Sequence, residues 1–188
     1  MDVLAAFLNT ILSSPYGQVI TGTYLAPDKR LGFRLLWMAR KDQKARRALV
    51  NGTQWNEQID IENTQTMKHI IAQHGWPGKK LVGSMGAQAA WLLVQHADRD
   101  REFQKQCHAL MEEAVKNNDA RSEDLAYLTD RICVGDGVPQ ICGTQWEHPI
   151  VDPEHVDERR AKMGLPPLSE YLAQSKEMME KVKQRRSK

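Results

Sequence analysis

The stretch from Gly83 to Asp100, GSMGAQAAWLLVQHADRD, constrains the fold most strongly, because it is the most apolar helical pattern in the chain. Its first half is rich in glycine and alanine, which let neighbouring helices approach closely. The WLLV run at 91–94 then supplies bulk, and apolarity all round a helix indicates burial on more than one side. We therefore predict a central helix that ends in three polar residues, Gln95, His96 and Asp98.

Further helical patterns flank this segment on both sides. Apolar residues recur at helical spacing over 31–50, 61–74, 101–116, 122–134 and 152–163, and a last helix can begin near residue 169. A chain of 188 residues with 41% hydrophobic and 27% charged residues can bury one real core. The sequence thus predicts a mainly α fold, a single-domain helical bundle around a buried central helix. The segment 138–146 is predicted to be a short β-hairpin or an extended loop.

The predicted organisation has three parts. Residues 1–30 form an N-terminal extension with a short helix and an extended arm, residues 31–175 form the helical domain, and residues 176–188 form a charged helix end. The apolar face over 2–13 fits a helix docked on the body better than a partner or membrane-surface helix, because it lacks a basic face.

Composition and motifs argue against several function classes. A net charge of +2 is too small to predict nucleic-acid binding, and no apolar run is long enough for a membrane span. The three cysteines include no CxxC pair, so no zinc site is predicted. The N-terminus carries Asp2 and no basic residue, which disfavours a secretory signal. We expect a cytoplasmic protein, and no particular cofactor is predicted.

Each polar candidate also has a structural interpretation. Asp42 and Arg46 stand at i,i+4, where an exposed pair forming a surface salt bridge is the simpler expectation. Asp98 or Asp100 can cap the helix that follows, and His96 can be a hydrogen-bonded core histidine. Asp130, near a helix C-terminus, is expected to pair with an arginine.

Three further interpretations concern stacking, nucleophilic and metal-binding roles. Trp76 fits a packing role in its Gly-Trp-Pro-Gly turn better than a ligand-stacking role. Cys142 has no nearby cation in the sequence to stabilise a thiolate, so we interpret it as a bystander. His96-x-Asp98 resembles part of a metal site, but residues at i and i+2 of a helix point in different directions, so no metal is predicted.

Several motifs together resemble a bacterial family, domain of unknown function 6624. They are Met38 with DQ at 42–43 and Arg46, Asn63 before GWP at 75–77, Gly83 before AWLLVQHAD at 90–98, LAYLTDR at 125–131, PQ at 139–140 with GTQ at 143–145, and VDERR at 156–160 with GL at 164–165. The resemblance covers roughly residues 33–171, and the first 30 residues lie outside it. Family members usually carry Tyr at the position of Cys142, so this member can differ in activity or ligand if that hydroxyl matters.

The resemblance favours a functional site, because its motif residues are polar types that core packing does not require. We hypothesise that they converge on one pocket, with His96 as general acid–base and Asp98 or Asp130 orienting it. Arg46 or Arg131 would then bind an anionic group. The other predicted ligand-binding residues are Asp42, Gln43, Gln95, Gln140, Gln145 and, less strongly, Trp76.

The alternative is a non-catalytic helical module, such as an interaction, accessory or immunity protein, whose polar residues form a structural hydrogen-bond network. The sequence leaves open a small-molecule ligand on the first hypothesis and a protein partner or second copy on the other.

Overall fold

The structure, a computed structural model, describes residues 25–50, 54 and 56–186. Within these residues the chain forms seven α-helices and a short 3-10 helix and has no β-sheet, which confirms the predicted mainly α bundle. The helix and extended arm expected before residue 25 lie outside the described residues. The elements are α3 (Lys29–Val50), α4 (Gln58–His74), α5 (Lys79–Gln95), α6 (Arg101–Lys116), α7 (Ser122–Gly135), η1 (Pro153–His155), α8 (Val156–Lys162) and α9 (Leu168–Arg186).

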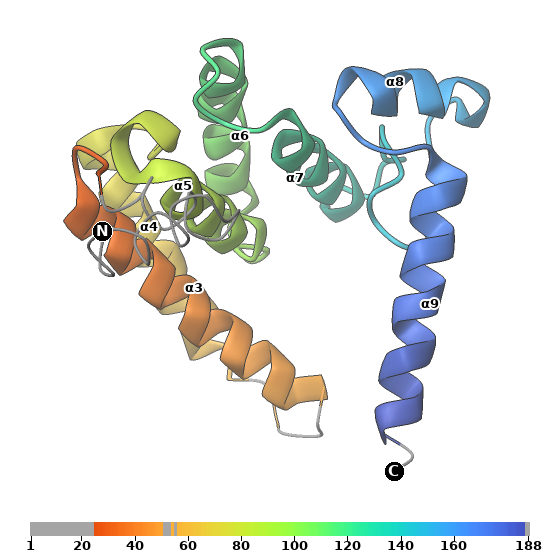
Figure 1. Cartoon of the computed structure of the whole chain (residues 1–188), viewed down its shortest axis with the longest axis horizontal. Helices are drawn as coiled ribbons and strands as arrows, with labels where there is room; N and C mark the ends of the chain where they lie inside the picture. Colours follow the sequence, from red (N-terminus) through yellow and green to blue (C-terminus); the bar gives the residue numbers. More distant parts are fainter. Residues whose placement is uncertain (1–24, 51–53, 55, 187–188) are drawn as a thin grey trace, which may run out of the picture.

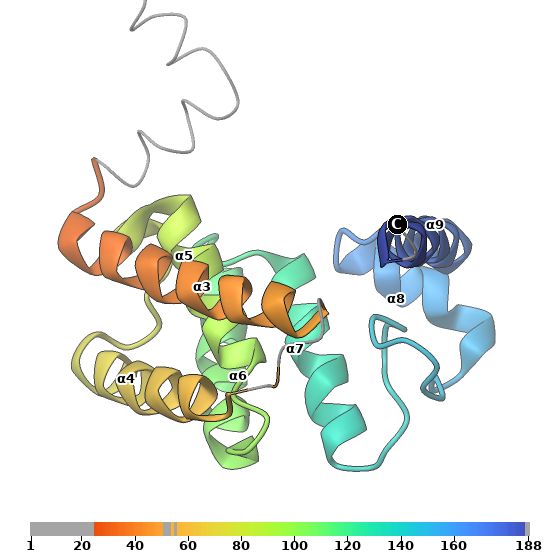
Figure 2. The same cartoon turned by 90° about the horizontal axis from the view of Figure 1, so that it is seen from below.

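Helix α5 is the centre of the bundle, as the sequence predicts (Figures 1 and 2). It contacts α3, α4, α6 and α7, and its longest interface is with α3. Val82, Ala90, Leu93 and Val94 are almost completely buried in these interfaces. Full burial of one valine or leucine side chain stabilises a fold by about 1.5–3 kcal/mol, so the apolar stretch contributes substantially to core stability.

Two glycines shape α5. The helix begins four residues before the expected start at Gly83, and Gly83 forms a kink with φ 73° and ψ 167°, a conformation that side-chain-bearing residues rarely adopt. Gly86 lies against α3, where an added Cβ would come within 3.2 Å of the Gly32 Cα atom and 2.9 Å of Val82. The small residues therefore permit the close α3–α5 packing that we predicted.

The structure agrees with one predicted helix start and differs at another. Helix α7 begins at Ser122, as the pattern over 122–134 predicts, although its N-cap residue is Arg121 and no side chain caps it. Asp152 and Pro153 open a 3-10 turn, not a single helix to Met163, and α8 begins only at Val156. The Asp100 cap is confirmed, because its Oδ1 accepts a hydrogen bond from the Phe103 N–H at 3.1 Å.

The C-terminal part packs beyond α7, on the side away from α3 (Figures 1 and 2). Residues 138–146 form an extended loop, and a single parallel bridge joins Gln140 to Ile150. Helix α9 runs without a break across residue 175, where we placed the border of the charged end. None of the helices in the described part of the chain has the length and apolarity that crossing a membrane requires.

Candidate functional site

The site is built on His96, which directly follows the last residue of α5. Its side chain is 14% exposed, and its Nδ1 atom lies 2.8 Å from Oδ2 of Asp42 on α3. The Asp42 side chain is completely buried, so the expectation of an exposed Asp42–Arg46 pair is wrong. The close α3–α5 packing brings this part of α3 against the end of α5 and buries the carboxylate.

Asp42 is surrounded by donors from side chains. Arg46 Nε lies 3.2 Å from both carboxylate oxygens, and Gln43 Nε2 donates to Oδ2 at 3.1 Å. Arg46 Nε also lies 3.0 Å from His96 Nδ1. If both nitrogens carry a hydrogen atom, neither can accept a hydrogen bond from the other. A carboxylate only accepts, so the consistent assignment has both Arg46 Nε and His96 Nδ1 donating to Asp42.

This assignment fixes the histidine tautomer. With the proton on Nδ1, a neutral His96 ring carries its lone pair on Nε2. Nε2 has no hydrogen-bond partner among the described residues. The arrangement thus holds the ring by one nitrogen and leaves the other available as a proton acceptor, as in a general base that a carboxylate orients.

Arg46 links Asp42 to a second carboxylate, Asp60, in the first turn of α4, through a 2.6 Å ion pair from Nη2 to Oδ1. Burial alone would raise the pKa of Asp42, but the hydrogen bond and charge of His96, together with Arg46, hold it below its usual value. At Asp60, burial raises the pKa. The positive charge of Arg46 lowers it, and the negative charges of Asp42 and Asp98 raise it further. Asp42 is therefore held in its ionised form, whereas burial makes Asp60 easier to protonate despite its pair with Arg46.

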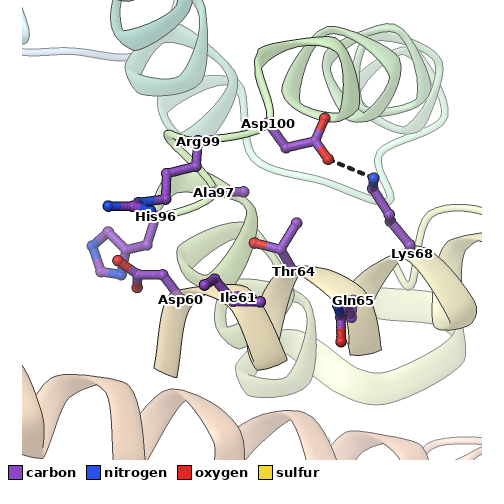
Figure 3. A pocket seen from close by; sticks show the side chains of 9 residues that line it. All are labelled: Asp60, Ile61, Thr64, Gln65, Lys68, His96, Ala97, Arg99 and Asp100. Atoms are coloured by element: carbon purple, nitrogen blue, oxygen red, sulfur yellow. Dashed lines mark ion pairs between the residues drawn. The ribbon is translucent and has the colours of Figure 1, made fainter. Parts of the chain in front are cut away.

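A cavity of about 190 Å³ opens beside His96 (Figure 3). One wall is a face of α4, on which Asp60, Thr64 and Lys68 recur every four residues and therefore share a side. His96 and Asp60 lie at the same end of the cavity, and the Arg99 side chain extends beside the His96 ring. A basic nitrogen, a carboxyl and a hydroxyl thus border one small space.

Two cations border this cavity, and both are paired. Lys68 Nζ lies 2.5 Å from Oδ2 of Asp100, which also caps α6. Arg99 pairs with Glu57, and both side chains are largely exposed. Exposed pairs of this kind are weak and exchange readily, so an incoming anionic group can compete for either cation.

The Asp98–Arg131 pair forms a separate contact. Arg131 Nε and Nη2 bind Asp98 Oδ1 and Oδ2 at 2.7 and 2.6 Å, joining the turn after α5 to α7. Gln95 is buried, and its amide donates to the Tyr127 carbonyl at 3.3 Å. The structure places Asp42, and not Asp98 or Asp130, against the His96 ring.

Asp130 organises the loop after α7. Its buried carboxylate accepts four hydrogen bonds of 2.7–2.9 Å, from the N–H groups of Ile141, Cys142 and Thr144 and from the Thr144 hydroxyl. The prediction that Asp130 pairs with an arginine is wrong, because the loop folds over the end of α7 and supplies backbone donors instead. We call Asp130 with these donors the Asp130 cluster.

The two glutamines of the loop hold the same segment. Gln140 Nε2 donates to the carbonyls of Gln145 and His148 at 2.8 and 2.9 Å, and its Oε1 accepts from the Gln145 N–H. The Gln145 side chain donates to the Thr144 hydroxyl at 3.2 Å. A second cavity, of about 450 Å³, lies between this loop and α9 and shares no lining residue with the His96 cavity.

Cys142 and Trp76 occupy other places. Burial raises the pKa of the Cys142 thiol to about 11, so it is protonated at neutral pH and is a poor nucleophile. Trp76 lines a third cavity, near the start of α5, together with Trp91 and Asp124. Among the described residues, no three His, Cys, Asp or Glu side chains are arranged to hold a metal ion.

The structure therefore divides the predicted site residues. It brings Asp42, Gln43, Arg46 and His96 together, and it distributes Asp98, Arg131, Gln95, Asp130, Gln140, Gln145 and Trp76 over other contacts. Sequence reasoning missed five polar residues that line the cavity, Asp60, Thr64, Lys68, Gln65 and Arg99. The i, i+4, i+8 spacing of the first three is a signal that could have found them.

Fold and site together define a mainly α, single-domain protein with a polar site at the C-terminal end of its central helix. The chain belongs to the family of unknown function DUF6624, whose family model matches residues 31–183. Comparisons with curated proteins and with solved structures gave no match. The family assignment agrees with the resemblance seen in the sequence, and it supplies no activity.

Proposed function

We propose that the protein binds a small polar molecule in the cavity beside His96 and catalyses a proton transfer on it. One observation carries the proposal: buried Asp42 fixes the His96 ring through Nδ1, and Nε2 of this cavity-lining ring has no partner among the described residues. The His96 side chain is 14% exposed, so Nε2 is accessible to a molecule in the cavity. An oriented imidazole with one free nitrogen is suited to accept a proton from a bound molecule.

Each group has a defined role in this proposal. His96 Nε2 takes a proton from a hydroxyl, an amine or a water, and ionised Asp42 stabilises the imidazolium that forms. Asp60, whose pKa burial raises, lies at the same end of the cavity and can return a proton to the reacting molecule there. Arg46 is fully engaged by Asp42 and Asp60, so it serves to position them.

The cavity limits the ligand. A volume of about 190 Å³ is below the roughly 300–1,000 Å³ of sites for drug-sized molecules, which favours a small metabolite. Lys68 and Arg99 at its border favour a substrate with an anionic group.

The competing function is a non-catalytic interaction module, and the density of side-chain bonds around Asp42 favours it. Arg46 and His96 both bind Asp42 from different helices, as they would in a network whose purpose is to specify the packing of α3 on α5. The two functions differ in whether His96 exchanges protons with a bound molecule.

The test is a screen of small polar metabolites by NMR with ¹⁵N-labelled histidine. We expect a neutral ring with hydrogen on Nδ1, and at least one compound that shifts the Nε2 resonance of His96. The same compound should not bind His96→Gln. The matched control is His108→Gln, because His108 bonds Thr129 from α6 and does not line this cavity. No shift at Nε2 from any compound, with His96→Gln as well folded as the wild type, would favour the interaction module.

A further inference from the structure

The cavity that Trp76 lines is separate from the His96 site. It has a volume of about 240 Å³ and lies between the Gly-Trp-Pro-Gly turn, α5 and the start of α7. The two cavities share no lining residue. Any ligand of this cavity is therefore independent of the proposed chemistry at His96.

Three polar groups that border this cavity have no hydrogen-bond partner among the described residues. The indole N–H groups of Trp76 and Trp91 are both buried and unpartnered. Asp124 is only 8% exposed, and its carboxylate accepts no hydrogen bond from the described residues, although it lies in the first turn of α7. The two indole N–H groups are closed off from solvent, so of the three only the Asp124 carboxylate can contact a molecule in the cavity. A largely buried carboxylate without a partner points to a bound cation.

The charges around the cavity have both signs. Asp124 supplies a buried negative charge, and Lys79 and Arg121 also line the space. Arg121 is partly engaged, because its Nη2 lies 3.3 Å from Glu123. A complementary molecule needs a cation for Asp124 and an anion for the two basic side chains.

We propose that this cavity binds a small molecule that carries both an ammonium and a carboxylate group, the class to which free amino acids belong. The ammonium group pairs with Asp124, and the indole rings nearby can add cation–π contact. The carboxylate pairs with Lys79 or Arg121. The cavity volume of about 240 Å³ favours a single small molecule of this class.

The state of Asp124 supports this assignment. Burial raises its pKa to about 6, the charge of Glu123 adds to this, and Arg121 and Lys79 oppose it. The carboxylate is thus ionised at neutral pH but incompletely compensated, and a bound ammonium would supply the missing charge. Ordered water is the alternative occupant, since water can donate to the Asp124 carboxylate.

The test is calorimetric titration of the full chain with the common L-amino acids near neutral pH. For each amino acid that binds, two matched compounds follow: the N-acetyl derivative, which lacks the ammonium group, and the methyl ester, which lacks the carboxylate. We expect at least one amino acid to bind, and both derivatives to bind about tenfold more weakly or not at all, as lost charge pairs require. Binding should also weaken as the pH falls below about 6, because Asp124 becomes protonated.

Variants assign the binding to this cavity. Asp124→Asn should lower affinity at least about tenfold, and Trp91→Phe should lower it less, because the ring face is kept and only the N–H is lost. The control is Glu102→Gln, which removes an exposed carboxylate from the matching first turn of α6. The proposal is overturned if no amino acid binds at about 10 mM, a concentration that detects even millimolar affinity. It is equally overturned if binding survives in Asp124→Asn, whose folding circular dichroism verifies.

Discussion

Asp42 and Asp130 are both completely buried, yet the two regions around them are built differently. Asp42 accepts its hydrogen bonds from side chains, those of Gln43, Arg46 and His96. Asp130 accepts three bonds from backbone N–H groups and one from a hydroxyl. The first set of donors includes a titratable ring that borders a cavity, and the second is a fixed part of the chain.

The difference separates two uses of a buried carboxylate. Backbone donors cannot rotate away or change charge, so the Asp130 cluster holds one loop conformation. Side-chain donors can rearrange, and His96 can gain a proton, so the Asp42 region can respond to a ligand. The donor set around a carboxylate therefore distinguishes the two regions where burial does not.

The largest expected effect is that of Asp130→Asn. The amide sets an NH₂ group against N–H donors and leaves buried groups unpaired, which should lower the free energy of unfolding by about 4 kcal/mol. Urea unfolding measures it. The control, Asp136→Asn, changes a partly exposed aspartate just after α7 and should cost well under half as much. Similar losses in the two variants would contradict the role of the Asp130 cluster.

Asp124→Asn should have the opposite sign, because Asp124 is a buried carboxylate without donors among the described residues. A pKa raised from 3.8 to about 6 in the fold means that ionisation destabilises it. The stability that the protonated group contributes is present below the unfolded-state value of 3.8 and is lost as the pH rises through about 6. Removing the charge should therefore stabilise the protein by about 2–3 kcal/mol above that pH.

The pH profile is the check on this second prediction. Urea unfolding near pH 4 and near pH 8 should show no gain at the lower value and the full gain at the higher one. A gain that is independent of pH would mean that the substitution acts through packing and not through the charge.

Asp42→Asn should cost about 2 kcal/mol, less than Asp130→Asn, because its side-chain donors can turn to other acceptors or to water. The pKa of Asp42 is lowered in the fold, so its contribution is present above the unfolded-state value of 3.8 and is lost as the pH falls through the folded value. The difference between wild type and variant should therefore shrink in acid. In the same variant, ¹⁵N NMR should show His96 losing its preference for hydrogen on Nδ1, and an unchanged tautomer would contradict the assignment to Asp42.

The helices were predictable because they depend on local periodicity. The α6 bounds agree with the prediction at both ends, and α5 is the central helix that its apolar stretch indicates. The kink at Gly83 and the 3-10 turn at Pro153 were missed, because both depend on how the ends of helices meet the rest of the fold. A glycine or a proline marks a place where the chain can bend, and it does not say in which direction.

The site was harder to predict, since it depends on which helices become neighbours. His96 and Asp42 are 54 residues apart, and only the packing of α3 on α5 joins them. The motif residues were recognisable as unusual polar types, but sequence alone could not assign Asp130 to a loop and Asp42 to a histidine. The four-residue spacing of Asp60, Thr64 and Lys68 is enough to predict that they share one face of α4. Nothing in the local sequence indicated that His96 would lie opposite this face.

The smallest expected effect concerns the Asp98–Arg131 pair, whose properties are intermediate between those of the Asp42 region and the Asp130 cluster. Its geometry is bidentate, as in a strong pair, but the two side chains are 45% and 28% exposed, so water screens their attraction. Arg131→Lys keeps the charge and loses one of the two bonds, and it should cost about 0.5–1 kcal/mol, an effect that high salt reduces. Urea unfolding at low and high salt measures both quantities. A decrease in the free energy of unfolding as large as that of Asp130→Asn would show that the turn after α5 depends on this pair. The loop that the Asp130 cluster holds would then not be more rigidly fixed than this turn.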